Sequence, residues 1–270
     1  MDNLNIMFIT SAILVSTILG ISQLSFNKGV FTCDSYVLNT YLYVNLCIMF
    51  MALVVQLLTY YKYSIFENLA AKNRFLFFFS FAIISIGSII GIHFTNAKNV
   101  ATKHLFWLIF ILSTSITFQP LHRLLMSSGN GGVIVSALLN TLILVCVLTL
   151  IAFKRPDFIS VSWGPVLFFA LLGVVLVEIT AMLTNSYNSK FHRIINYIVI
   201  MIFIGYLLYD TKMLQIRSKK CLETCEYNPG FRWDGSEPCV QPDYIKESVN
   251  IFLDIYNLFI RILGLGSRRN

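Results

Sequence analysis

Long blocks of apolar residues constrain this chain more than any other feature of its sequence. A bilayer core about 30 Å thick needs roughly 20 such residues at about 1.5 Å of helical rise each. Lipid offers no partner for unpaired backbone groups, so the blocks are expected to be helices. The sequence therefore predicts an all-α polytopic membrane protein with about seven or eight spans. The predicted spans are Ile6–Leu24, Leu42–Tyr60, Phe75–Ile92, Leu105–Leu121, Val133–Phe153, Phe158–Leu183, Ile194–Tyr209 and Tyr244–Leu265.

Composition supports the same class of protein. Of the 270 residues, 57% are hydrophobic and 12% are charged, whereas a soluble domain carries about 25% charged residues. The short alternating segments of an outer-membrane barrel do not occur in the sequence. No interior stretch has the polar, glycine- and proline-rich character of a linker, so we expect a single membrane domain over residues 1–270.

The first and last blocks differ from the others. Ile6–Leu24 follows a short segment with Asp2 and no basic residue, and no clear cleavage site comes after it, so we expect a retained span and not a secretory signal. Tyr244–Leu265 is interrupted by polar residues and cannot face lipid on all sides. Those residues are Lys246, Glu247, Asn250, Asp254, Asn257 and Arg261.

The net charge of +7 comes from Lys and Arg residues that are spread over the loops. Membrane-flanking residues account for this distribution, and no basic stripe with stacking aromatics occurs outside the apolar blocks, which excludes a nucleic-acid-binding protein. The densest basic cluster opens the long segment 211–243, which favours a cytoplasmic position for it and places both termini on the other side. Lys62, Lys72 and Arg74 would then lie outside, against the rule.

Six cysteines fall into two groups. Cys47 and Cys146 lie within predicted spans, where cysteine usually serves as a small apolar residue. The other four lie on one side of the membrane, where disulfides, free thiols and a metal such as zinc all remain open. These are Cys33, Cys221, Cys225 and Cys239. The rest of the 211–243 loop is rich in aromatic and turn residues, and it is where we expect a protein partner to dock.

Ionisable residues inside spans are costly and raise a functional hypothesis. Asp210 closes one apolar block, and Asp254 lies in the middle of the last one. Asn250, Asn257 and Arg261 recur with Asp254 at helical spacing and form one supporting polar stripe. Glu178 stands near the end of its block, where it is expected to reach the membrane interface.

Three roles remain open for Asp210 and Asp254. If they meet in a low-dielectric site, they cannot both ionise cheaply and would share a proton, which makes a proton-sensitive latch. Their carboxylates are also the hard oxygen ligands that calcium prefers. The third role is structural: each is a satisfied buried polar group that fixes the register of its helix.

Enzyme chemistry is not indicated by the sequence. None of the four histidines forms a pair with metal-ligand spacing. The glycine-rich stretch at Ser127–Gly132 is expected to be a turn between spans and lacks the pattern of a nucleotide-binding loop. No nucleophile elbow occurs either, so we expect a protein that is not an enzyme and has no cofactor other than a bound or permeant calcium ion.

Two blocks near the carboxyl end resemble the Bax inhibitor family, the transmembrane Bax-inhibitor-motif proteins. GYLLYDTKML at 205–214 is similar to the family's span that ends in Tyr-Asp-Thr-Gln, and PDYIKESVNIFLDIYNLFIRILG at 242–264 is similar to its last helix. Weaker similarity occurs at VVQLLT (54–59) and in the block around Ala137 and Thr141. The resemblance extends over about residues 40–266.

The resemblance implies a seven-helix bundle whose polar last helix is central and enclosed by the other six. It implies that Asp210 and Asp254 correspond to the family's paired aspartates. It further implies a pH-sensitive calcium leak across an intracellular membrane, of endoplasmic-reticulum or Golgi type, and suppression of cell death.

Three features depart from the family pattern. Ile6–Leu24 is an additional span, the 211–243 loop is longer than usual, and Phe75–Ile92 has no mid-span arginine of the kind that latches the aspartates in bacterial members. The additions suggest an alternative function, a structural membrane anchor in a larger assembly such as a virus particle, without transport activity. The membrane would then be that of a virion.

Overall fold

The computed structural model describes residues 3–24, 26–27, 30–31, 33, 35–60, 72–184, 189–226 and 242–267. Two short strands, β1 (Phe26–Asn27) and β2 (Val30–Phe31), pair antiparallel between the first two helices. The 3-10 helix η1 (Pro156–Phe158) precedes α7. The α-helices are α1 (Asn3–Leu24), α2 (Tyr36–Tyr60), α4 (Arg74–Phe94), α5 (Val100–Ser127), α6 (Gly131–Lys154), α7 (Trp163–Leu183), α8 (Ser189–Glu226) and α9 (Tyr244–Gly266).

Seven helices in the described part of the chain, α2 and α4 to α9, are long and apolar enough to cross a membrane. The prediction of an all-α, multi-span membrane protein is therefore confirmed. Helix α1 is additional to these seven. Its stretch Thr10–Gln23 is apolar but shorter than the other spans, so a crossing by α1 stays a prediction.

Helix α8 is much longer than the apolar block that predicted it. We expected the helix to end near Tyr209 and a loop to begin at Thr211, but the structure continues the helix to Glu226. The segment from Thr211 to Glu226 contains neither proline nor glycine and is rich in Lys, Leu and Glu, which favour helix. The apolar block marked the part of the helix that fits a membrane, and the helix itself continues beyond it.

By internal packing, the chain divides into two compact units. One contains Met1–Met126 and Ile216–Val249, and the other contains Ser127–Gln215 and Asn250–Asn270. Helices α8 and α9 contribute to both units, because each boundary falls inside them. The side chains of α9 that the structure describes are buried or half-buried along its length, and its enclosure by the other six helices stays a prediction.

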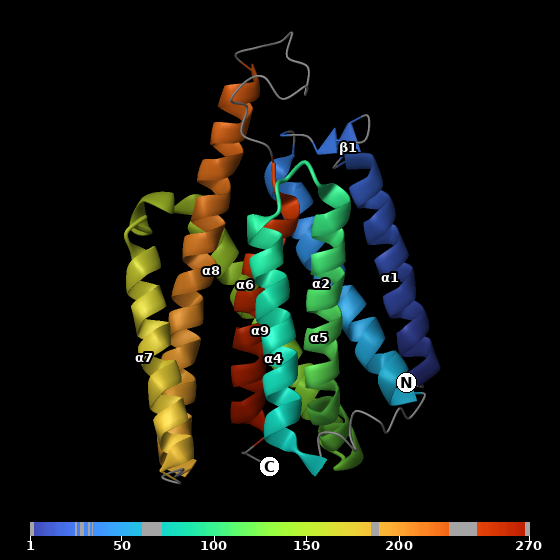
Figure 1. Ribbon diagram of the computed structural model, residues 1–270, viewed down its shortest axis with the longest axis vertical. Coiled ribbons are helices and arrows are strands. Elements are labelled where there is room, and N and C mark those ends of the chain that lie inside the picture. The colour runs from blue at the N-terminus through green and yellow to red at the C-terminus, as the bar shows by residue number, and fades with distance from the viewer. Residues whose placement is uncertain are drawn as a thin grey trace. The chain divides into compact units, whose positions relative to one another are not determined.

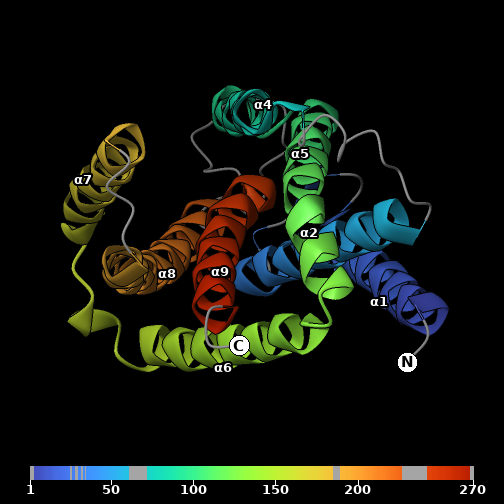
Figure 2. The same cartoon turned by 90° about the horizontal axis from the view of Figure 1, so that it is seen from below.

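In the first unit, α1 lies along α2 (Figures 1 and 2). Thr10 donates a hydrogen bond to Gln56 at 3.1 Å, and Asn45 donates one to Thr17 at 2.8 Å. Both bonds pair polar side chains on two apolar helices, and such hydrogen bonds between helices assist their association. The additional helix is therefore attached to α2 by specific polar contacts as well as by apolar packing.

Helices α2, α4 and α5 of the first unit are joined by close contacts. The indole of Trp107 on α5 donates to the thiol of Cys47 on α2 at 3.0 Å. Between α4 and α5, a Cβ added at Gly91 would lie 2.7 Å from the ring of Phe106. Glycine at position 91 therefore allows the close approach of these two helices, as small residues commonly do in membranes.

In the second unit, α7 lies beside α8 (Figures 1 and 2). A Cβ added at Gly205 would lie 2.7 Å from a methyl carbon of Leu167, and one at Gly164 would lie 2.7 Å from the hydroxyl of Tyr209. Towards the other neighbour, Gln215 of α8 donates to the backbone carbonyl of Ala152 of α6 at 3.2 Å. Because Gly164 and Gly205 have no side chain, α7 and α8 can approach each other closely at these two positions.

Large apolar side chains remain exposed on the outer helices. On α7, Val166 and Phe169 are each 67% exposed, and on α6 Ile143 is 63% exposed. A soluble protein would rarely expose contiguous apolar surface on this scale. Exposure to acyl chains accounts for it, so the chain is a multi-span integral membrane protein in a lipid bilayer.

Candidate functional site

Helix α9 begins at a cap supplied by its own sequence. Asp243 precedes the helix, and its carboxylate accepts a hydrogen bond from the backbone N–H of Lys246 at 3.2 Å. Aspartate is favoured at this position because it satisfies an N–H group that has no partner inside the helix. Pro242, just before the cap, cannot continue a helix backwards, so the sequence fixes where α9 starts.

The two aspartates singled out in the sequence meet in the second unit. Asp254 of α9 is 4% exposed, and its carboxyl group lies within hydrogen-bonding reach of the carboxyl group of Asp210 on α8. The phenol of Tyr206, one turn before Asp210, lies near enough to both carboxyl groups to interact with them electrostatically. In the part of the chain that the structure describes, the Oδ2 atom of Asp254 accepts no hydrogen bond.

A buried pair of carboxyl groups has an unusual electrostatic balance. Two negative charges a few ångströms apart repel strongly when water is excluded, so one proton shared between them is favoured over two ionised groups. Besides the disfavoured state with both groups ionised, the pair has one state with a shared proton and one with both groups neutral, and the contact between α8 and α9 differs between these two.

The supporting stripe divides into residues with different roles. The Asn257 amide donates to the backbone carbonyl of Leu253 on its own helix at 2.8 Å. Arg261 reaches other helices: it donates to both oxygens of Glu178 on α7, at 2.6 and 3.1 Å, and to the side-chain oxygen of Asn196 on α8 at 3.0 Å. Asn250 is half-buried one turn before Asp254.

Glu178, for which an interfacial position stays a prediction, is paired with Arg261 in the structure. Their side chains are 20% and 22% exposed, so the pair is largely shielded. The sequence separation of 83 residues hides this pairing from any local pattern. The available signal was the presence of opposite charges in two apolar blocks, since intramembrane charges usually pair with one another.

A second polar cluster, which sequence analysis missed, surrounds the start of α9 in the first unit. Lys103 of α5 forms an ion pair with Asp243, and its side chain is only 1% exposed. The same ammonium group donates to the backbone carbonyl of Ile92 at 2.9 Å. A buried lysine is tolerated only when it is paired and hydrogen-bonded in this way.

Further contacts hold the first turn of α9. Arg217 of α8 donates to both carboxylate oxygens of Glu247. The hydroxyl of Tyr36 accepts from the backbone N–H of Asp243 at 3.3 Å, and Asn39 donates to the hydroxyl of Tyr244 at 3.4 Å. We call Tyr36, Asn39, Lys103 and Arg217 the α9 collar, because all four contact residues 243–247.

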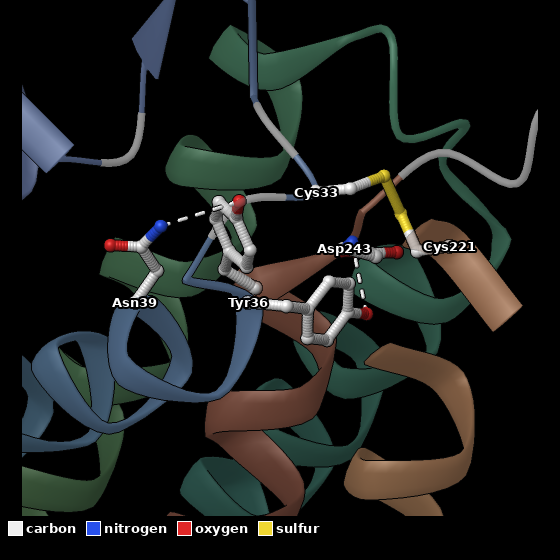
Figure 3. The surroundings of a disulfide bond; sticks show 6 residues. Cys33, Tyr36, Asn39, Cys221 and Asp243 are labelled. Carbon is white, nitrogen blue, oxygen red and sulfur yellow. Dashed lines mark hydrogen bonds between the residues drawn. A yellow bond between two sulfur atoms is a disulfide. The ribbon is translucent and has the colours of Figure 1, made fainter. Parts of the chain in front are cut away.

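A disulfide lies beside the α9 collar. It joins Cys33, just before α2, to Cys221 near the end of α8, with a Cα–Cα distance of 5.7 Å (Figure 3). Of the three states left open for these cysteines, the structure therefore shows a disulfide for this pair. Cys47 and Cys146 are free thiols within spans. Cys239 and the side chain of Cys225 lie outside the described residues, as does the segment 227–241 of the predicted docking loop.

Calcium binding by the aspartates stays a prediction. Within the described ranges, no group of three or more His, Cys, Asp or Glu side chains is arranged to hold a metal ion. Asp210 and Asp254 offer two carboxyl groups, whereas a closed calcium site uses six to eight oxygen ligands. What the pair offers is therefore an open arrangement, in which an ion would keep most of its water.

Comparison with known proteins shows which family the chain resembles in sequence. Residues 33–270 match a family model described as inhibitor of apoptosis-promoting Bax1. The protein LIFEGUARD 1 of Arabidopsis thaliana is 27% identical over 160 residues, which is 58% of this chain and 57% of that protein. The chain thus matches less than two thirds of the length of this relative. The family match begins at Cys33, so α1 precedes it.

Proposed function

Because this chain belongs to the Bax inhibitor family, we propose that it is a pH-sensitive calcium leak of an intracellular membrane, gated by Asp210 and Asp254. The observation that supports this most is the contact between the two carboxyl groups, with Asp254 buried on α9. Intramembrane acidic residues that meet across helices commonly mark ion and proton pathways.

Protonation is the switch in this proposal. With one shared proton, the two carboxyl groups hold α8 and α9 together and keep a negative charge in a shielded site. A second proton removes that charge and the strong, charge-assisted hydrogen bond with it. The helices then separate more easily at this point, so calcium flux rises as the pH falls.

Calcium efflux from liposomes that contain the purified full-length chain tests the proposal across pH 5 to 8. Wild type should leak faster at the acidic end. Asp254→Asn and Asp210→Asn should each abolish the wild-type pH response, because the remaining carboxyl group has no second acid with which to share a proton. The matched control is Asp157→Asn, since Asp157 is an exposed carboxylate on η1; this variant should keep the wild-type profile.

Two outcomes would contradict the leak. One is a flux from folded wild-type protein no greater than that of empty liposomes. The other is an unchanged pH profile in both aspartate variants. Circular dichroism and a monodisperse elution profile establish that each variant is folded before its flux is compared.

Suppression of cell death is the cellular role that this leak would serve, because a steady leak lowers the calcium stored in an internal membrane. Cells that express the chain should survive a calcium-dependent death stimulus better than cells that express Asp254→Asn. Equal protection by both would separate survival from the leak.

The alternative function is a membrane anchor in a larger assembly. Helix α1 supports it, because α1 precedes the family match and is attached to α2 by two side-chain hydrogen bonds. An anchor would keep its assembly partner after Asp254→Asn and lose it after deletion of residues 1–24, as a pull-down from the native membrane would show.

A further inference from the structure

The ion pair between Arg217 and Glu247 and the contact between Asp210 and Asp254 join the same two helices. Seven residues separate Asp210 from Arg217 on α8, and seven separate Glu247 from Asp254 on α9. Residues seven apart lie on nearly the same face of a helix, about two turns along it. One antiparallel register of α8 against α9 therefore satisfies both contacts.

The two contacts differ in what they can specify. The Nη1 atom of the charged Arg217 guanidinium donates to both oxygens of the Glu247 carboxylate, which fixes the distance between α8 and α9 at this level. Two carboxyl groups attract one another only through a shared proton and repel when both are ionised. The register in which Asp210 faces Asp254 thus needs a support outside the pair, and Arg217–Glu247 is placed to supply it.

The disulfide reinforces this support. Cys221 follows Arg217 by four residues, so both side chains lie on one face of α8. At the other end of the disulfide, Tyr36 follows Cys33 by three residues, and its hydroxyl contacts the backbone of Asp243 (Figure 3). Both ends of the disulfide therefore lie within about one helical turn of a collar residue that contacts α9.

The start of α9 is closely held by these contacts. Tyr244, Ile245 and Val249 are each 0% exposed, and the ring of Tyr244 packs edge-on against Tyr36 at a centroid distance of 5.2 Å. Glu247, in the same turn, is 5% exposed. A first turn fixed in this way sets the rotation of the whole helix, because α9 contains no proline.

We infer that Arg217 and Glu247, braced by the Cys33–Cys221 disulfide, are positioning residues that set the register of α8 and α9 and so bring Asp210 opposite Asp254. The inference rests on the proposed function where it concerns the leak. Asp210 and Tyr206 of α8 lie close to Asp254, and their alignment with α9 depends on the Arg217–Glu247 ion pair about two turns away.

The first arm of the test measures the pH profile of calcium efflux. Arg217→Glu should raise efflux at pH 7 about tenfold, equivalent to about 1.4 kcal/mol, since two like charges now face each other where the register was held. The charge swap Arg217→Glu/Glu247→Arg should restore most of the wild-type profile. Lys219→Glu is the matched control, because this exposed side chain lies two residues away on the same helix and makes the same change of charge.

The second arm needs no leak. Asp210→Cys/Asp254→Cys on a Cys146→Ser background should form a cross-link under mild oxidation, because the two positions face each other. Arg217→Glu should slow this cross-linking about tenfold, and the charge swap should restore it. Cys33→Ser/Cys221→Ser should also slow the cross-linking. If Arg217→Glu does not fold, Arg217→Gln replaces it in this experiment.

The outcomes separate this inference from the proposed function. Slower cross-linking that the charge swap rescues supports the register role, even if wild type does not leak and the proposed function fails. Cross-linking that is unchanged in Arg217→Glu, Arg217→Gln and Cys33→Ser/Cys221→Ser overturns it. An altered efflux profile with unchanged cross-linking also overturns it, because the flux would then depend on these residues without any change of register.

Discussion

At its start, α9 presents Asp243 and Glu247 to cations, whereas two turns further along it presents Asp254 to a second carboxyl group. The first arrangement lowers the electrostatic energy at any pH at which the acids are ionised, so it fixes the helix. The second is stable only while a proton is shared, so it responds to pH. One helix thus combines a permanent attachment with a conditional one, and the charge of the partner decides which is which.

The largest effect is expected at the buried lysine of the attachment. Lys103→Met should lower the free energy of unfolding by about 3 kcal/mol, because it leaves Asp243 without its cation in a shielded site. Chemical denaturation in detergent micelles measures this. Lys98→Met is the control at an exposed lysine of the same unit. A loss of unfolding free energy no larger than that of the control would show that the start of α9 is not held by charge.

A smaller loss is expected at the opposite-charge pair in the second half of α9. Glu178→Gln should cost about 2 kcal/mol, because it removes the carboxylate that balances the largely shielded Arg261 guanidinium and leaves only hydrogen bonds to an uncharged amide. A double-mutant cycle with Arg261→Gln, followed by denaturation, isolates the coupling between the two side chains. Additive losses would mean that the pair contributes nothing beyond its separate residues.

The like-charged pair should change stability in the opposite direction. Asp254→Asn should raise the free energy of unfolding by about 1 kcal/mol, because the new amide can donate to Asp210 and the buried acceptor without a partner is removed. The same denaturation experiment at pH 7 detects the gain. A loss of stability would show that the carboxyl pair, too, is a permanent attachment, and the comparison would fail.

The smallest effect is expected at an exposed pair on α8. Lys219 and Glu223 lie 3.7 Å apart and are 80% and 64% exposed. Glu223→Gln should change the free energy of unfolding by less than about 0.5 kcal/mol, since water screens such pairs. This value gives the baseline for the other three, and a larger effect would mean that charge at this end of α8 acts through something other than the pair.

The spans could be predicted from the sequence because lipid imposes a minimum length on any crossing segment. The ends of the helices could not, because a change from apolar to polar residues marks the edge of the membrane. Helix α8 continues well past Tyr209, and α5 runs from Val100 through Pro120 to Ser127, although a span was expected only to Leu121.

Of the candidate site, the two aspartates could be predicted from the sequence and the ion pairs could not. Asp210 and Asp254 were named because each lies in an otherwise apolar block and matches a family motif. The ion pair of Lys103 with Asp243 was missed because 140 residues separate the partners and each residue alone resembles an ordinary flanking charge. Such pairings depend on which helices become neighbours, and a single sequence carries no record of that.

The length of α8 has a consequence for how the two ends of the protein communicate. At about 1.5 Å per residue, its 38 residues extend about 57 Å, nearly twice the thickness of a bilayer core. Cys221 therefore lies about 16 Å beyond Asp210 along the axis of the same helix. The disulfide at Cys221 and the carboxyl group of Asp210 are thus carried by one continuous helix, so the bond and the carboxyl pair have a covalent connection through the backbone of α8.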